Sequence, residues 1–102
     1  MVVEILFFEG CPNHEAAREL VDRVAGELGL RPEVRLVEVP DVETAERLRF
    51  LGSPTIRVDG RDIEPGADAR TEFMLACRVY RTDGGVSGRP DERWLRDVLA
   101  PG

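Results

Sequence analysis

The sequence lacks lysine entirely: all fourteen basic residues among its 102 positions are arginine. Without an ε-amino group the chain cannot form a Schiff base, so lysine-based catalysis is excluded. Positive charge is also outweighed, because twenty acidic residues leave a formal net charge of -6. Proteins that bind nucleic acid or anionic membranes carry basic patches, and this balance therefore argues against both kinds of partner.

Long apolar runs are also missing. No stretch approaches the roughly 18 consecutive apolar residues that a membrane-spanning helix needs. The apolar beginning of the chain is interrupted by Glu4, with neither a basic segment before it nor a small-residue cleavage site after it, which is not the pattern of a signal peptide. We therefore expect a cytoplasmic protein. In that compartment two cysteines are more often catalytic or metal-binding than structural.

The sequence does contain a clear alternation of strand and helix patterns. Its length suits a single domain, 1–102. Apolar or alternating runs predict strands, and apolar residues at helical spacing predict helices. The expected elements are a strand at 2–8, a helix at 13–28, a strand at 34–39, a helix from Asp41 to 51, a hairpin at 53–63 around Asp59-Gly60 and a helix at 90–99.

This order, β-α-β-α-β-β-α, predicts an α/β fold. Two strands joined by a helix lie parallel through a right-handed crossover, and an Asp-Gly turn makes the last two strands antiparallel. We therefore expect a four-stranded mixed sheet with helices on both faces. Residues 64–89 form an insertion before the last helix. The apolar part of the insertion, 71–80, fits a helix, a strand or one turning into the other.

The segment Phe-Phe-Glu-Gly-Cys-Pro-Asn-His at 7–14 places Cys11 at a strand-to-helix junction. Unpaired backbone N–H groups and the helix dipole favour negative charge there. The nucleophilic form of a cysteine is the thiolate, which such a position stabilises. The competing interpretation is a small buried core residue, and the acidic neighbours Glu9 and Glu15 also disfavour a thiolate. The backbone junction nevertheless favours a reactive thiol.

The element order and two local motifs resemble the thioredoxin superfamily. The first motif is Cys11 at the start of the first helix, and the second is Gly-Ser-Pro-Thr-Ile at 52–56, which resembles the loop that holds the superfamily's cis-proline. The resemblance covers 2–63 and resumes at 90–99. It departs from thioredoxin at His14, where thioredoxins have a second cysteine. The 7–14 segment is similar to that of small bacterial thioredoxin-like proteins with a Phe-Phe-x-Gly-Cys-Pro start.

The resemblance implies a thioredoxin-like fold and a thiol redox activity that needs no cofactor. It implies a cis Ser53–Pro54 bond beside Cys11. Cys11 would attack a disulfide or oxidised thiol, carried by a protein or by glutathione. The residues that would contact this substrate are Pro12, Ser53, Pro54 and Thr55.

His14 and Cys77 are the other two candidate catalytic residues. His14 faces the same side of the first helical turn as Cys11, and it would stabilise the thiolate as an imidazolium or take the thiol proton as a neutral base. The alternative is a solvated histidine. Cys77 is most simply a core residue within an apolar stretch. However, the insertion leaves the sheet at the end where Cys11 lies, so Cys77 could fold over the site and resolve a mixed disulfide, as could an external thiol such as glutathione.

A second hypothesis is a non-catalytic thioredoxin-fold module that binds a protein partner or a soft metal ion. Cys11, His14 and Cys77 offer three nitrogen and sulfur ligands, which suit such an ion. However, Cys-x-x-His is a weak signal and no second Cys/His pair accompanies it. We therefore do not expect a dedicated structural zinc site.

Overall fold

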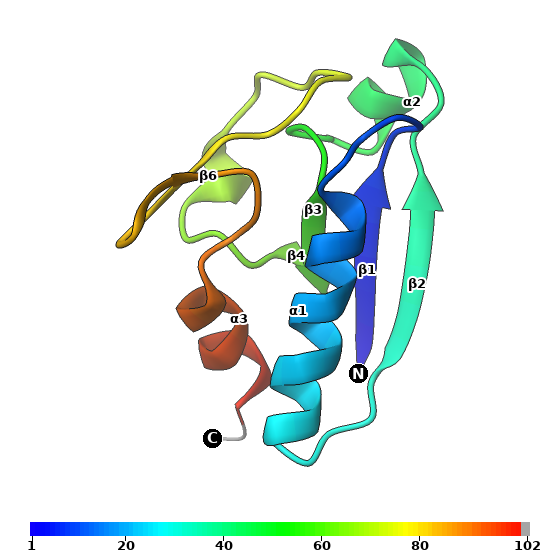
Figure 1. The fold of residues 1–102 in the computed structure, drawn as a ribbon. Coiled ribbons are helices and arrows are strands. Elements are labelled where there is room, and N and C mark those ends of the chain that lie inside the picture. The colour runs from blue at the N-terminus through cyan, green and yellow to red at the C-terminus, as the bar shows by residue number, and fades with distance from the viewer. Residues whose placement is uncertain (101–102) are drawn as a thin grey trace.

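The computed structural model describes residues 1–100 and arranges them around one mixed sheet (Figure 1). In chain order the elements are β1 (Val2–Phe7), α1 (His14–Glu27), β2 (Glu33–Glu38), α2 (Val42–Arg47), β3 (Thr55–Val58), β4 (Arg61–Asp62), the short 3-10 helix η1 (Ala67–Ala69), β5 (Tyr80–Thr82), β6 (Gly85–Ser87) and α3 (Glu92–Leu99). The sheet order is β2-β1-β3-β4. Only the β1–β2 pair is parallel. The predicted α/β fold with a four-stranded mixed sheet is therefore confirmed.

The helices α1 and α3 cover one face of the sheet. In Figure 1 α1 crosses in front of the strands and α3 lies beside it, and Leu95 and Leu99 of α3 join the same apolar cluster as α1 and the strands. Alternate strand residues such as Val3, Ile5 and Ile56 point to this face and join the larger apolar cluster. Helix α1 contributes residues at helical spacing, as its sequence predicts. These are Ala17, Leu20, Val21 and Val24.

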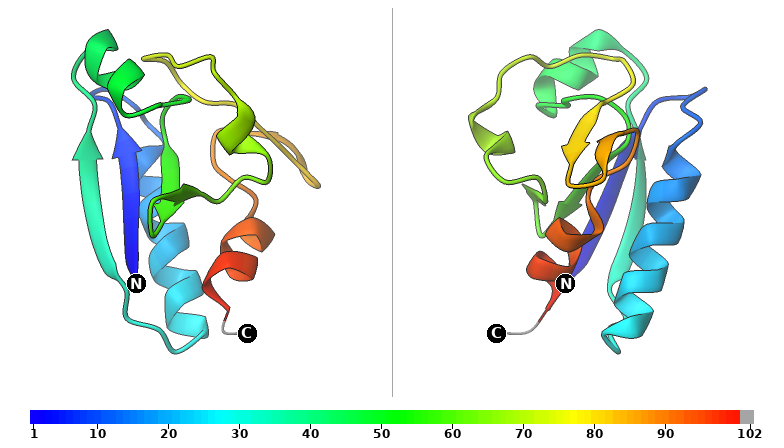
Figure 2. Two further views of the ribbon diagram at one scale, coloured as in Figure 1. Left: turned by 180° about the vertical axis from the view of Figure 1, so that it is seen from behind. Right: turned by 60° about the vertical axis from the view of Figure 1, so that its left-hand side comes forward.

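The short helix α2 covers only one end of the opposite face. It lies where β1 and β2 finish, and the rest of that face has no helix over it (Figure 2, left). A second, smaller apolar cluster fills this end and includes Leu6, Val39, Ala45 and Phe50. Helices therefore lie on both faces, but the two faces are covered very unequally.

Helix α2 begins as predicted but ends early. Asp41 is its N-cap, and its side chain accepts the N–H of Thr44 at 2.7 Å. The expectation that the helix would continue to 51 is wrong, because the chain leaves helical geometry after Leu48. The guanidinium of Arg57 donates to the carbonyls of Leu48 (2.7 Å) and Arg49 (3.0 Å). These carbonyls thus find partners without another helical turn.

The Asp59-Gly60 hairpin joins β3 to β4 as predicted. Both turn residues have positive φ, 49° at Asp59 and 87° at Gly60. This geometry is what a two-residue hairpin turn of the primed type requires.

The insertion at 64–89 contains η1 and the β5–β6 hairpin but no α-helix. Its apolar part, 71–80, is neither the helix nor the strand expected there: it is irregular chain with one bridge residue, Cys77, and only Tyr80 belongs to β5. The insertion lies beside the end of the sheet where β1 finishes (upper left in Figure 1).

The last helix, α3, is capped by Asp91, whose side chain accepts the N–H of Arg93 at 2.9 Å. The sequence predicts that this helix begins at Pro90. Pro90 instead lies before the cap, and the helix begins at Glu92. Like every other helix within residues 1–100, α3 is not long and apolar enough to cross a membrane.

Candidate functional site

The candidate site lies at the end of the sheet where β1 finishes and β3 begins. In their antiparallel pairing, Leu6 of β1 lies opposite Thr55 of β3. The chain that follows β1 turns at once, because the N–H of Cys11 donates to the carbonyl of Phe8 at 3.1 Å. The loop that carries Cys11 and the beginning of β3 are therefore at the same end of the sheet.

Cys11 is buried, with 3% of its surface exposed. It belongs to neither of the two apolar clusters that form the core. Its neighbours Gly10 and Pro12 are exposed. Solvent therefore reaches the loop but scarcely reaches Cys11.

The first turn of α1 has no side-chain cap. Asn13 is the N-cap residue, but its side chain makes no capping hydrogen bond. The insertion packs onto it instead: a Cβ at Gly88 would lie 2.4 Å from Nδ2 of Asn13. The first backbone N–H groups of α1 thus remain without a side-chain acceptor, and this leaves the helix N-terminus favourable to a nearby negative charge.

His14 is held by the backbone of the loop. Its Nδ1–H donates to the carbonyl of Cys11 at 2.9 Å, and this nitrogen must carry the hydrogen because a carbonyl oxygen only accepts. The imidazole also stacks on Phe7, with ring centroids 4.6 Å apart. The structure therefore shows His14 bonded to the carbonyl of Cys11. Action of His14 on the sulfur stays a prediction.

The Ser53–Pro54 peptide bond is cis, as predicted. Ser53, Pro54 and Thr55 are all buried, whereas Pro12 is exposed. The hydroxyl of Thr55 donates to the carbonyl of Gly52 at 2.6 Å. The hydroxyl of Ser53 is buried and has no hydrogen-bond partner within residues 1–100. Of the four predicted substrate contacts, only Pro12 is therefore open to solvent.

The insertion covers Ser53 by pairing with its backbone. The N–H of Ser53 donates to the carbonyl of Ala76 at 2.8 Å, and the carbonyl of Ser53 accepts the N–H of Arg78 at 2.8 Å. These two bonds form a parallel β-bridge in which Cys77 lies opposite Ser53. A Cβ at Gly52 would lie only 2.9 Å from the Cβ of Arg78. The two segments are therefore in direct backbone contact.

A buried ionic cluster anchors this segment, and the sequence analysis missed it. The guanidinium of Arg78, 2% exposed as a residue, pairs with Asp62 at 2.7 Å and with Glu64 at 2.6 Å, and it donates to the hydroxyl of Thr55 at 3.0 Å. Its carbon Cζ lies 4.4 Å from the ring centroid of Tyr80. Burial disfavours the charge, but the carboxylates of Asp62 and Glu64 outweigh burial and raise the pKa of Arg78 above its ordinary value.

Tyr80 completes the anchor. Its hydroxyl donates to the carbonyl of Pro54 at 2.5 Å. Burial raises the pKa of Tyr80 far above its ordinary value, so the phenol stays neutral and keeps its proton for this bond. The one sequence feature that could have indicated this anchor is the spacing of Arg78 and Tyr80, because residues two apart on an extended chain share a side. The sequence does not show which acidic residues they meet.

Cys77 is exposed and not part of the core, so the simplest prediction for it is wrong. The segment that carries Cys77 pairs with Ser53, in the way that the prediction of an insertion folded over the site requires. Both Cys77 and Cys11 are free thiols in the structure. Within residues 1–100 no group of three or more His, Cys, Asp or Glu residues is arranged to hold a metal ion, and Cys11, His14 and Cys77 do not form one.

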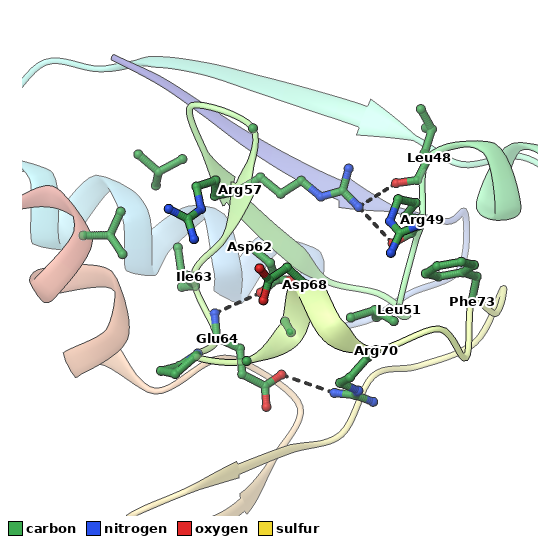
Figure 3. Close-up of a pocket in the computed structure, with 17 residues that line it drawn as sticks. Leu48, Arg49, Leu51, Arg57, Asp62, Ile63, Glu64, Asp68, Arg70 and Phe73 are labelled. Atoms are coloured by element: carbon green, nitrogen blue, oxygen red, sulfur yellow. Dashed lines mark hydrogen bonds and ion pairs between the residues drawn. The ribbon is translucent and has the colours of Figure 1, made fainter.

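A separate hollow of about 490 Å³ lies between the end of α2, the β3–β4 hairpin and η1 (Figure 3). Arg57 and Arg70 line it together with acidic side chains, and Arg70 pairs with Glu64 at 3.4 Å. None of the predicted site residues lines this hollow. Asp62 and Glu64, which bind Arg78, also line this hollow.

No protein-family model, curated protein or solved structure gave a significant match to this chain.

Proposed function

We propose that this chain is a thioredoxin-like thiol redox protein in which the thiolate of Cys11 attacks a disulfide. The observation that carries the proposal is that three features lie together at one end of the sheet. The cysteine at the start of α1, the cis-proline at the start of β3 and the segment with the second cysteine all lie there. This combination is the one that the resemblance to thioredoxins leads us to expect.

The chemistry needs a stabilised anion and a partner sulfur. The uncapped first turn of α1 supplies N–H groups and a dipole that favour the thiolate of Cys11. The thiolate attacks one sulfur of a disulfide, a mixed disulfide forms and the other sulfur leaves as a thiolate. Cys77 then attacks the sulfur of Cys11, the Cys11–Cys77 disulfide forms and the substrate sulfur leaves as a thiolate. An external thiol such as glutathione would instead attack the substrate sulfur, form a mixed disulfide with it and release Cys11 as a thiolate.

A non-catalytic thioredoxin-fold module is the second candidate, and one observation favours it. Cys11 is 3% exposed, and the insertion already occupies the backbone of Ser53. A site covered in this way would serve as a scaffold with an inert thiol, which would bind a protein partner elsewhere on its surface.

The pH dependence of alkylation separates the two candidates. In the Cys77→Ser variant Cys11 is the only thiol, and its rate of reaction with iodoacetamide reports the thiolate fraction. The proposal is supported by a rate that has already levelled off at neutral pH, since only a stabilised thiolate gives this profile. An ordinary cysteine would instead give a rate that rises until about pH 8.5. Burial lowers the rate at every pH and, because it disfavours the charged thiolate, also moves the levelling-off to higher pH. Levelling off at neutral pH would therefore require that the loop and the helix N-terminus stabilise the thiolate by more than burial destabilises it.

The same variant in denaturant is the matched control, because unfolding removes the helix and must restore the ordinary profile. An ordinary profile in the folded protein as well would reject the reactive thiol and leave the second candidate. A disulfide-reductase assay of the wild type against Cys11→Ser then tests turnover directly.

A further inference from the structure

The backbone of Ser53 has no free hydrogen-bonding group. Its N–H is bonded to the carbonyl of Ala76 and its carbonyl to the N–H of Arg78, both at 2.8 Å. A polypeptide that docks as an added strand needs such groups unpaired. An extended protein substrate could therefore pair with Ser53 only after displacing the segment 76–78.

This segment is anchored too firmly to serve as a removable cover. Moving it would separate the buried guanidinium of Arg78 from Asp62 and Glu64. Removing one partner of a buried ion pair leaves an uncompensated charge, which is strongly destabilising. The segment is therefore a permanent part of the site.

The same segment turns Cys77 toward solvent. From 77 to 80 the burial alternates, with Cys77 and Val79 exposed and Arg78 and Tyr80 buried. Cys77 is thus the thiol that a reagent in solution meets first, while Cys11 is 3% exposed.

The segment with Cys77 also comes near the loop with Cys11. Leu75 and Phe8 line the same small hollow, and the carbonyl of Phe8 accepts the N–H of Cys11. The two cysteine-bearing segments therefore approach each other through Leu75 and Phe8, while Cys77 is exposed and Cys11 is buried.

Resting on the proposed function only in that the chain is a thiol redox protein, we infer that the substrate is a low-molecular-weight disulfide and that the two cysteines act in the reverse of the order given above. Cys77 receives the substrate, and Cys11 then resolves the mixed disulfide. The thiolate of Cys77 attacks one sulfur of the small disulfide, a mixed disulfide forms on Cys77 and one small thiol leaves, taking a proton from solvent. The thiolate of Cys11 attacks Sγ of Cys77, the Cys11–Cys77 disulfide forms and the second small thiol leaves. The chain gives up two electrons and the substrate gains them; two small thiols reverse both steps.

Intact mass spectrometry after mixing with glutathione disulfide tests this order. We expect Cys11→Ser to accumulate one glutathione adduct, on Cys77, because nothing resolves it. The wild type should carry no lasting adduct and should lose two hydrogens as the internal disulfide forms. Cys77→Ser should form its adduct about tenfold more slowly than Cys11→Ser, since its thiol is buried.

Two controls make the result specific. The double variant Cys77→Ser/Val79→Cys keeps an exposed thiol on the same side of the segment but not opposite Ser53, so we expect an adduct that Cys11 does not resolve. Reduced wild type should also react about tenfold more slowly with a protein disulfide such as insulin than with glutathione disulfide at equal disulfide concentration.

The possible failures are distinguishable. If Cys77→Ser forms its adduct as fast as Cys11→Ser, or if insulin reacts as fast as glutathione disulfide, the inference is wrong. In either case the proposed function stands as long as the wild type forms its internal disulfide. If neither variant forms an adduct and the wild type keeps two thiols, the proposed function fails as well.

Discussion

The two cysteine-bearing segments are held in opposite ways. The loop with Cys11 is held by local bonds, from His14 to the carbonyl of Cys11 and from Cys11 to Phe8, yet its cysteine is buried. The segment with Cys77 is held by distant partners, Ser53 and the acidic residues that bind Arg78, yet its cysteine is exposed. The exposure of a thiol and the anchoring of its backbone are therefore set independently. The exposure of a thiol depends on what packs over its segment. The anchoring of the backbone depends on where its polar groups find partners.

Breaking the anchor should give the largest effect. In Arg78→Met, the carboxylates of Asp62 and Glu64 lose their buried partner and Thr55 loses a donor. We expect the free energy of unfolding to fall by about 3–5 kcal/mol, because breaking a buried ion pair leaves uncompensated charge. Urea unfolding followed by circular dichroism measures this loss.

Arg81→Met is the matched control for that change. Arg81 is exposed and makes no ion pair within residues 1–100, so its replacement should change the free energy of unfolding by less than about 0.5 kcal/mol. If Arg78→Met cost no more than Arg81→Met, the segment would not be anchored as described, and a polypeptide could displace it.

Pushing the two segments apart should give a smaller effect. Gly52 has φ +118°, and a Cβ there would lie 2.9 Å from the Cβ of Arg78. Gly52→Ala should therefore lower the free energy of unfolding by about 2–4 kcal/mol, through backbone strain and overpacking. It should also raise the rate at which Cys77 is alkylated, since its segment is loosened. Unfolding curves and alkylation kinetics measure the two effects.

Gly26→Ala is the control for this substitution. Gly26 lies in α1 with open space around its Cα, so alanine should raise the free energy of unfolding by about 0.5–1 kcal/mol. Equal effects at the two glycines would mean that the contact between Gly52 and Arg78 does not exist in solution.

The sequence predicts those parts of the fold that local chemistry decides. The apolar spacing of α1, the cap at Asp41 and the Asp59-Gly60 turn each act within a few residues, and all three are confirmed. The early end of α2 was not predictable in this way, because the group that replaces the next helical turn is Arg57, which follows in β3.

In the candidate site, too, the features set by nearby residues were predictable and those set by distant residues were not. The positions of Cys11 and of the cis Ser53–Pro54 bond follow from motifs that lie next to their strands. The exposure of Cys77 does not, because an apolar-looking stretch predicts burial of its apolar members. The segment instead buries a charged residue, Arg78, and this is favourable only because Asp62 and Glu64 reach it from another part of the chain.

The smallest expected effect comes from an ion pair that lies at the surface, where the comparison with Arg78 is sharpest. Glu92 of α3 bonds to Arg23 at 2.5 Å and to Arg96 at 2.8 Å, and these hydrogen bonds lower the pKa of Glu92 to about 2. Because the pKa of Glu92 is depressed in the folded state, these bonds stabilise the fold at pH values above the ordinary pKa range of a carboxylate. This stabilisation is lost as the pH falls toward 2.

The side chain of Glu92 is 36% exposed, so solvent screens the pair and its contribution should be small. Glu92→Gln should therefore be slightly less stable than the wild type at pH 7 in low salt. The difference should shrink at pH 2 and in high salt, and unfolding curves at the two pH values measure it. A loss at pH 7 as large as that of Arg78→Met would contradict the contrast, because it would mean that burial does not decide what an ion pair contributes in this molecule.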